Sequence, residues 1–110
     1  MNIEYKSSRV RKLCTKEKKG RKKLGASIAR SLIKRLYQLQ AFENLQDVPT
    51  TLPFRRHKLS GEYKNCFAVN IKGPYRLIFK PIVYSGRPIE EISLSEINTI
   101  EIWEVTDYHD

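Results

Sequence analysis

Two histidines, His57 and His109, are the only imidazoles in the sequence, and each lies among residues that could assist proton transfer. His57 is flanked by three basic residues, Arg55, Arg56 and Lys58. His109 closes the segment Asp107-Tyr108-His109, in which the carboxylate can orient an imidazole ring and the phenol can donate a proton. These residue types are suited to general acid and base chemistry on a negatively charged substrate.

Metal-independent cleavage of RNA needs such a set of groups. A base must take the proton of the 2′-hydroxyl, an acid must protonate the departing 5′-oxygen, and cations must stabilise the charge that develops on the phosphate. Imidazole suits the first two tasks because its reference pKa is about 6.5. If the strand with His57 and the last strand belong to one sheet, the two histidine clusters could meet on its open face beside Arg76. The sequence leaves open which histidine would be the acid and which the base.

Other catalytic and ligand-binding patterns are lacking. The sequence contains no GxxxxGK phosphate loop, no nucleophile elbow and no group of metal-ligating residues, so we expect no metal and no cofactor. Cys14 and Cys66 are too few and too far apart for a zinc site or a disulfide framework. We interpret them as free thiols.

The length and hydropathy limit the protein class. A chain of 110 residues allows one modest core, so we expect a single domain over residues 1–110 and exclude a dinucleotide-binding dehydrogenase, a kinase and a TIM barrel. The sequence has no run of about 18 apolar residues and no apolar stretch of signal-peptide length after its first basic residues. We therefore expect a cytoplasmic protein without membrane contact.

The basic residues are concentrated in the first part of the chain. Residues 1–40 contain thirteen basic and two acidic residues, a net charge of +11, whereas residues 41–110 contain eight basic and ten acidic residues, a net charge of −2. Such a charge distribution attracts a polyanion to one side of the molecule, so nucleic acid or an acidic protein is the expected partner. The alternative is a lysine-rich helix that only keeps the protein in solution.

Hydrophobic periodicity predicts two helices near the N-terminus. A short strand over residues 2–6 precedes a basic helix that begins at Ser7 or Ser8 and runs to about Lys19, where Gly20 interrupts it. A second helix is predicted over residues 21–40, with its leucines on one face and basic residues on the other.

The rest of the chain has the pattern of a small sheet. Strands are predicted over residues 54–59, 66–72, 75–82 and 99–106, with a hairpin turn at Gly73-Pro74 and an irregular connection over residues 83–98. Ile102 and Trp103 are adjacent large residues, so either both faces of the last strand are covered or the strand contains a bulge, and we interpret Trp103 as a packing residue. The whole pattern predicts an α+β fold with an N-terminal strand and two helices packed on one face of a small antiparallel sheet.

Segments that span nearly the whole chain resemble the RelE/ParE superfamily of bacterial toxins, in particular its HigB-like branch of killer proteins. Besides the N-terminal strand, the segments that carry this resemblance are Arg21-Lys22-Lys23-Leu24-Gly25, His57-Lys58-Leu59-x-Gly61, Tyr75-Arg76-Leu77-Ile78-Phe79 and Glu104-Val105-Thr106-Asp107-Tyr108-His109. The connection over residues 82–98 is longer and more acidic than the family pattern.

The resemblance implies a RelE-like fold and a toxin of a type II toxin-antitoxin system. Such a toxin is a ribosome-dependent mRNA endonuclease that inhibits translation and is neutralised by a helix-turn-helix antitoxin, here HigA-like, through which the pair contacts operator DNA. It implies catalysis by His57, Asp107, Tyr108 and His109. The residues expected to bind RNA or phosphate are Lys58, Arg76, Arg55 and Arg56. Those expected to contact the ribosome or the antitoxin are Arg21, Lys22, Lys23, Arg30 and Lys34.

Two other functions fit parts of the sequence. A ParE-like poison of DNA gyrase has the same fold but does not need a histidine pair, so His57 and the Asp107-Tyr108-His109 terminus favour the nuclease. A non-enzymatic module that binds nucleic acid is supported only by the basic N-terminal part, and the sequence lacks clustered aromatic residues on one pair of strands.

Overall fold

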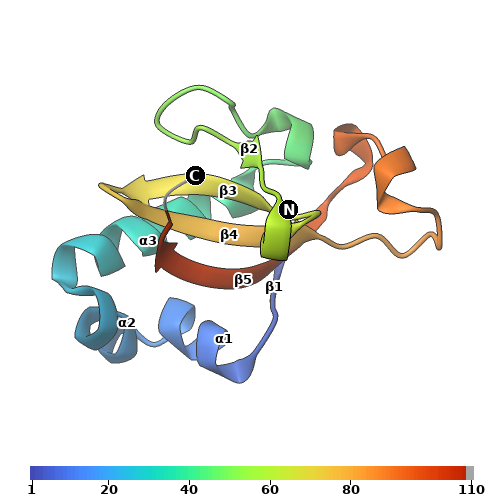
Figure 1. Ribbon diagram of the computed structural model, residues 1–110. Helices are drawn as coiled ribbons and strands as arrows, with labels where there is room; N and C mark the ends of the chain where they lie inside the picture. The colour runs from blue at the N-terminus through green and yellow to red at the C-terminus, as the bar shows by residue number, and fades with distance from the viewer. Residues whose placement is uncertain (109–110) are drawn as a thin grey trace.

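Residues 1–108, which the computed structural model describes, form a five-stranded sheet and three α-helices (Figure 1). In chain order the elements are β1 (Asn2–Tyr5), α1 (Ser8–Thr15), α2 (Glu17–Leu24), α3 (Ala26–Ala41), β2 (His57–Lys58), β3 (Phe67–Lys72), β4 (Tyr75–Pro81) and β5 (Thr99–Asp107). The predicted α+β class is confirmed. None of the helices in this part of the chain is long and apolar enough to span a membrane.

The N-terminal half contains three helices where the sequence predicted two. Ser7 caps α1 by accepting a hydrogen bond from the backbone N–H of Val10 (3.1 Å). The break expected at Gly20 is wrong, because Gly20 lies buried inside α2, where a Cβ atom would come within 3.0 Å of the carbonyl oxygen of Leu13. The chain turns at Gly25 instead, whose φ of 84° is a conformation that residues with a Cβ rarely adopt.

The strand order is β1-β5-β4-β3-β2, so the two ends of the described chain lie in neighbouring strands. Strands β2 to β5 are antiparallel and Gly73-Pro74 forms the expected hairpin, but β1 pairs with β5 in parallel. The sheet is therefore mixed. All three helices lie between β1 and β2 in the chain, and a connection of this length allows β1 to run parallel to β5.

Strand β2 is shorter than the predicted strand over residues 54–59. Pro49 and Pro53 cannot donate backbone hydrogen bonds, and Arg55 has a φ of 48°, so the chain before His57 folds into turns. Beyond the N-terminal end of β2, other groups form the hydrogen bonds along the edge of β3. The backbone N–H of Asn70 donates to the carbonyl of Phe54 (2.8 Å), and the Asn70 carbonyl accepts from Nε of Arg35 (2.7 Å).

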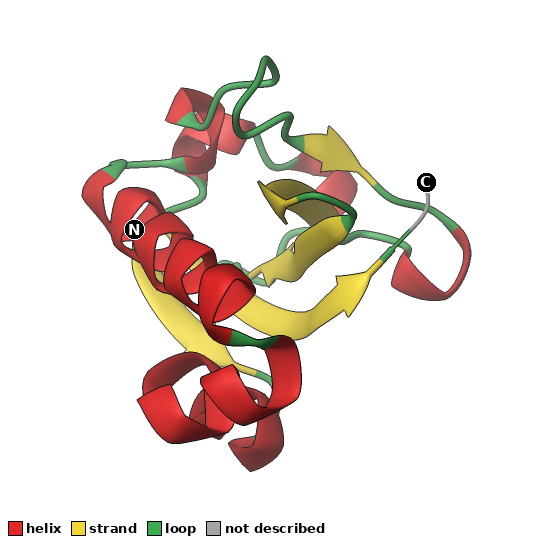
Figure 2. Cartoon of the chain, turned by 90° about the vertical axis from the view of Figure 1, so that its left-hand side faces the viewer, coloured by secondary structure: helices red, strands yellow, loops and turns green. Residues whose placement is uncertain are grey.

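The helices cover only one face of the sheet. Helix α3 packs across this face and α1 lies against β5 (Figures 1 and 2). The main core lies between them and includes the fully buried side chains of Leu32, Leu39, Leu77, Phe79 and Ile102. The opposite face, which we call the open face, is covered by no α-helix of the described chain (Figure 2). A second, smaller apolar cluster lies on it, formed by Leu59, Cys66, Ala68 and Ile78.

Strand β5 contains a bulge at Trp103, one of the two arrangements that its sequence allowed. Ile78 pairs with Glu104 and the next residue, Phe79, pairs with Ile102, so Trp103 has no partner in β4. Ile102 is buried in the main core, whereas Trp103 packs against the small cluster on the open face.

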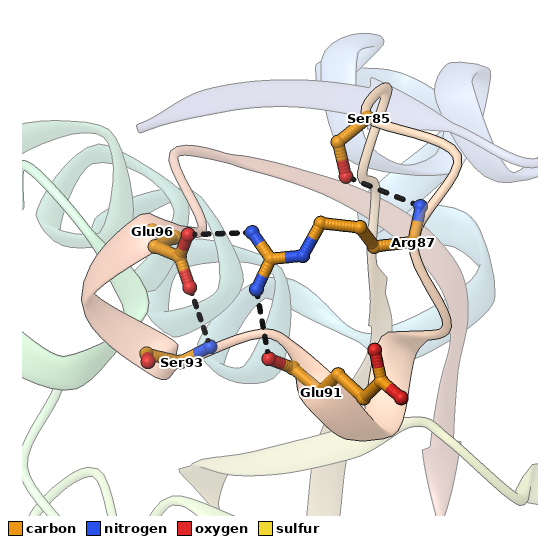
Figure 3. Close-up of polar contacts among 5 residues, drawn as sticks. All are labelled: Ser85, Arg87, Glu91, Ser93 and Glu96. Carbon is orange, nitrogen blue, oxygen red and sulfur yellow. Dashed lines mark hydrogen bonds and ion pairs between the residues drawn. The ribbon is translucent and has the colours of Figure 1, made fainter.

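The connection over residues 82–98 contains two short 3₁₀ turns, Ile89–Glu91 and Leu94–Glu96, and projects from one end of the sheet (Figure 1). Arg87 holds this segment together (Figure 3). Its Nη1 contacts Oε1 of Glu96 (3.0 Å) and its Nη2 donates to the carbonyl of Glu91 (3.0 Å). The other carboxylate oxygen of Glu96 accepts from the backbone N–H of Ser93 (2.8 Å), which closes a capping box.

Candidate functional site

The strand register aligns polar residues from four strands, β2 to β5, on the open face. His57 pairs with Ala68, which pairs with Ile78, and Asn70 pairs with Arg76, which pairs with Thr106. Directly paired residues lie on the same face of a sheet, and so do residues two positions apart. The imidazole of β2 and the guanidinium of β4 therefore belong to one surface.

The ring of His57 is held in one orientation by its own loop. Its Nδ1 lies 2.8 Å from the backbone carbonyl of Arg55. A carbonyl oxygen can only accept, so Nδ1 carries the proton and the lone pair of the neutral ring is on Nε2. Nε2, which is buried, is thus the ring nitrogen that can accept a proton.

Arg76 and Asn70 each have a polar atom without a partner in the described part of the chain. Nη1 of Arg76 donates to the carbonyls of Gly73 (2.8 Å) and Tyr75 (3.1 Å), which fixes the guanidinium at the β3–β4 hairpin. Nε of Arg76 and Oδ1 of Asn70 are buried and have no hydrogen-bond partner within residues 1–108. Buried polar atoms are normally paired, so these two groups are candidates for ligand contacts.

Two residues of the predicted terminal triad fall within the described chain. Asp107 is exposed at the end of β5, where it pairs with Tyr75. Tyr108 packs against the small cluster that contains Ala68, and its ring meets that of Tyr63 edge-to-face with centroids 5.7 Å apart. His57 on edge strand β2 and Tyr108, which follows β5, therefore border one patch of the open face. His109 lies outside the described residues.

Burial in this patch affects the phenol of Tyr63. Its pKa is raised, first by burial and then by the nearby carboxylate of Glu62. Tyr63 is therefore a neutral hydrogen-bonding group across the physiological pH range.

Two of the predicted phosphate-binding residues point to the other face. Lys58 pairs with Phe67 of the main core, and it lines a pocket formed with residues of the 82–98 connection. Nε of Arg56 donates to the carbonyl of Val48 (2.9 Å), its guanidinium lies 5.9 Å from the Phe67 ring centroid, and burial lowers its pKa. Adjacent positions in a strand alternate between faces, so these two side chains do not join His57 on the open face.

The cations expected to contact the ribosome or the antitoxin lie on exposed parts of α2 and α3. Lys22 and Lys23 line an open groove of about 400 Å³ around Leu13, together with Arg9 and Lys19. The other three, Arg21, Arg30 and Lys34, are exposed, and Arg21 also contacts Glu17 at 3.2 Å. These residues form a basic surface on the helical side of the protein.

Sequence reasoning did not include Asn70, Lys6, Lys80 or Trp103 in the site, although all four are near it. Arg76 and Lys80 are four positions apart in β4, so alternation puts them on the same face. Nothing in the sequence brings Lys6 to that face, because the contact depends on the parallel pairing of β1 with β5. Lys6 lies with its Nζ 3.7 Å from the centroid of the Trp103 ring.

Within residues 1–108, no group of three or more histidine, cysteine, aspartate or glutamate side chains could hold a metal ion. No known family model matches the sequence, and no curated protein matches it either.

Proposed function

We propose that the protein is a toxin of a type II toxin-antitoxin system that cleaves mRNA on the ribosome and so inhibits translation. The observation that carries this proposal is the shared location of His57, Arg76 and Tyr108 on the open face of the sheet. An oriented imidazole, a fixed guanidinium and a phenol are the groups that metal-independent cleavage of RNA requires.

The chemical step moves two protons and breaks one bond. The 2′-oxygen of a nucleotide attacks the adjacent phosphorus while its proton passes to a base, a role that we assign to Nε2 of His57. The bond from phosphorus to the 5′-oxygen breaks, and the leaving oxygen takes a proton from an acid. Tyr108 and His109 are the candidates for this acid. The products are a 2′,3′-cyclic phosphate and a 5′-hydroxyl.

Arg76 stabilises the negative charge that develops on the phosphate oxygens. Nε of Arg76 is a charged donor without a partner in the described chain, and a charge-assisted hydrogen bond to phosphate is stronger than one between neutral groups. The guanidinium is fixed at the hairpin before substrate binds, so little reorganisation is needed during the reaction.

The basic surface of α2 and α3 supplies the attraction to the ribosome or to the antitoxin. Cations such as Lys22 and Lys23 neutralise phosphates and release counterions, which makes binding to ribosomal RNA strongly dependent on salt. The cognate antitoxin is a helix-turn-helix, HigA-like protein that silences the toxin and binds operator DNA. This assignment rests on the resemblance to HigB-like toxins, and it places the protein in the cytoplasm.

The test compares His57→Ala with Lys58→Ala, which alter adjacent residues on opposite faces of the sheet. Each chain is induced from a tightly repressed promoter, and the 5′ ends of cellular mRNA are mapped minutes later. The wild type and Lys58→Ala are expected to produce new 5′-hydroxyl ends within translated reading frames. His57→Ala, checked for folding by circular dichroism, is expected to produce none.

Other outcomes would point to the other functions. Growth arrest with intact messages and an SOS response would support gyrase poisoning, and an absence of arrest would support a binding module. Cleavage by His57→Ala at the wild-type rate would remove His57 from the mechanism.

A further inference from the structure

A second feature of the open face is the groove beside Trp103, at the junction of β1, α1, β5 and the turn that follows β2. The groove has a volume of about 450 Å³ and is open to solvent. Its lining residues are Lys6, Ser7, Arg9, Glu62, Tyr63, Trp103 and Glu104. This set combines two aromatic rings with both cations and carboxylates.

The bulge in β5 is the reason that an indole lies in this groove. Because Trp103 has no partner in β4, its side chain shares the open face with Glu104 instead of entering the main core beside Ile102. The indole Nε1 donates to Oε1 of Glu101 (2.9 Å), which fixes the orientation of the ring. The ring is half-buried, so part of its surface remains accessible.

The group now over this ring is one that a ligand could displace. Nζ of Lys6 lies 3.7 Å from the ring centroid and Nζ of Lys80 lies 5.6 Å from it. Lys6 is exposed, and a cation over an aromatic ring at an exposed site is held weakly. A nucleobase stacks on an indole more strongly, and an ammonium displaced from the ring could then pair with the phosphate of the same nucleotide.

The groove is continuous with the proposed catalytic residues. Tyr63 lines the groove, and its ring meets that of Tyr108 edge-to-face with the ring centroids 5.7 Å apart. Glu104 lies in the same row of paired residues as His57, three strands away, which corresponds to roughly 14 Å at the usual strand spacing. A short stretch of extended, single-stranded RNA can span the separation between Glu104 and His57. A double helix is too wide to enter a groove of this volume.

We infer that the Trp103 groove is a binding subsite for one unpaired nucleobase of the RNA substrate, on the β1–β5 side of the scissile phosphate. This inference rests on the proposed function and specifies its substrate as single-stranded RNA. The base stacks on Trp103, and Lys6, displaced from the ring, contacts its phosphate, while Arg9 remains paired with Glu104 (3.0 Å). The carboxylate of Glu62 accepts hydrogen bonds from an exocyclic amino group, so adenine is favoured over uracil, which has none.

Trp103 is the only tryptophan of the chain, so its fluorescence reports on this groove alone. The full-length protein, made by chemical synthesis because it is proposed to inhibit translation, is titrated with short 2′-O-methyl oligoadenylate, which cannot be cleaved because its 2′-oxygen is blocked. The matched probes are 2′-O-methyl oligouridylate and an abasic oligomer of equal charge. We expect oligoadenylate to quench the tryptophan emission strongly, oligouridylate to do so less, and the abasic oligomer to leave it unchanged.

Variants measured with a fluorescein-labelled oligoadenylate give an independent readout. Loss of stacking in Trp103→Leu is expected to weaken binding about tenfold, whereas Lys58→Ala on the opposite face leaves affinity unchanged. The affinity of the conservative variant Trp103→Phe is expected to lie between those of Trp103→Leu and Lys58→Ala. This variant replaces Trp103→Leu in the test if the leucine variant is poorly folded.

The outcomes separate this inference from the proposed function. Equal binding of the abasic oligomer, or binding of oligoadenylate without quenching, would overturn the subsite even if the protein cleaves mRNA. Quenching by an acidic peptide and not by RNA would overturn it in favour of a protein ligand. Quenching by oligoadenylate in a protein that leaves cellular mRNA intact would retain the subsite and refute the nuclease.

Discussion

Arg35 is a basic residue of α3 that we expect to stabilise the fold rather than to bind a partner. Its side chain is buried, at 8% relative exposure, whereas Arg30 on the same helix is exposed. Nε donates to the carbonyl of Asn70 (2.7 Å), Nη1 donates to Gln38 (2.6 Å), and the guanidinium lies 4.5 Å from the ring centroid of Phe54. It thus completes the edge of β3 beyond the N-terminal end of β2.

The cost of Arg35→Met can be worked out from these contacts. The methionine fills much of the space of the arginine stem, but the carbonyl of Asn70 loses its partner, which costs about 1–3 kcal/mol. Loss of the contact with Phe54 adds about 0.5–1 kcal/mol. Burial lowers the pKa of Arg35, and removing this buried charge recovers part of the cost. We expect a net loss of roughly 1–3 kcal/mol in the free energy of unfolding.

Urea denaturation followed by circular dichroism measures this loss. The matched control is Arg30→Met, an exposed change on the same helix, which should alter the free energy of unfolding by less than about 0.5 kcal/mol. Arg35→Lys retains the charge but not the planar fork, so its stability should lie between those of the wild type and Arg35→Met. Equal stability of Arg35→Met and Arg30→Met would refute the reasoning.

Three further predictions concern stability, pH and thiol reactivity. Gly25→Ala should lower the free energy of unfolding, measured by urea denaturation, by about 1–3 kcal/mol, because φ of this residue is 84°. No atom lies within 4 Å of the new Cβ, so the loss comes from backbone conformation alone. The pKa of Glu96 is lowered by the backbone N–H of Ser93 and by Arg87. The capping box should therefore be fully formed above the ordinary glutamate pKa of about 4.3, and it should be lost as the pH falls through the lower pKa of the folded state. Loss of amide-exchange protection at Ser93 below that pH, measured against the intrinsic exchange rate, would show this, and Glu96→Ala should lack this protection at all pH values. Burial raises the pKa of Cys14 to about 12 and also raises that of Cys66, so neither thiol should react with a disulfide reagent at pH 8 until denaturant is added.

Much of the secondary structure could be predicted from the sequence, because it depends on residues a few positions apart. The alternation in residues 66–72 and 75–82 predicted β3 and β4 to within a residue, and Gly73-Pro74 predicted their hairpin. The helix boundaries could not be predicted in the same way. A glycine can end a helix or allow close packing inside one, and only the approach of Leu13 to Gly20 selects the second role.

The candidate site was predictable in residue type but not in arrangement. The cluster around His57 was visible in the sequence, yet the sheet separates Lys58 and Arg56 from His57, because neighbouring positions of a strand face opposite ways. The sequence likewise grouped basic residues by their proximity along the chain, and this grouping says nothing about which ones are buried.

By itself the sequence determined the α+β class, the types of its elements and the concentration of positive charge in its first forty residues, all of which depend on local composition and periodicity. Only the tertiary structure decided the parallel pairing of β1 with β5, the bulge that turns Trp103 to the open face, and the proximity of Lys6 to that ring. The physical reason is that strand order and register depend on contacts between residues nearly one hundred positions apart, such as Ile3 with Ile100. Their stability comes from burying a shared core rather than from any pattern within one segment.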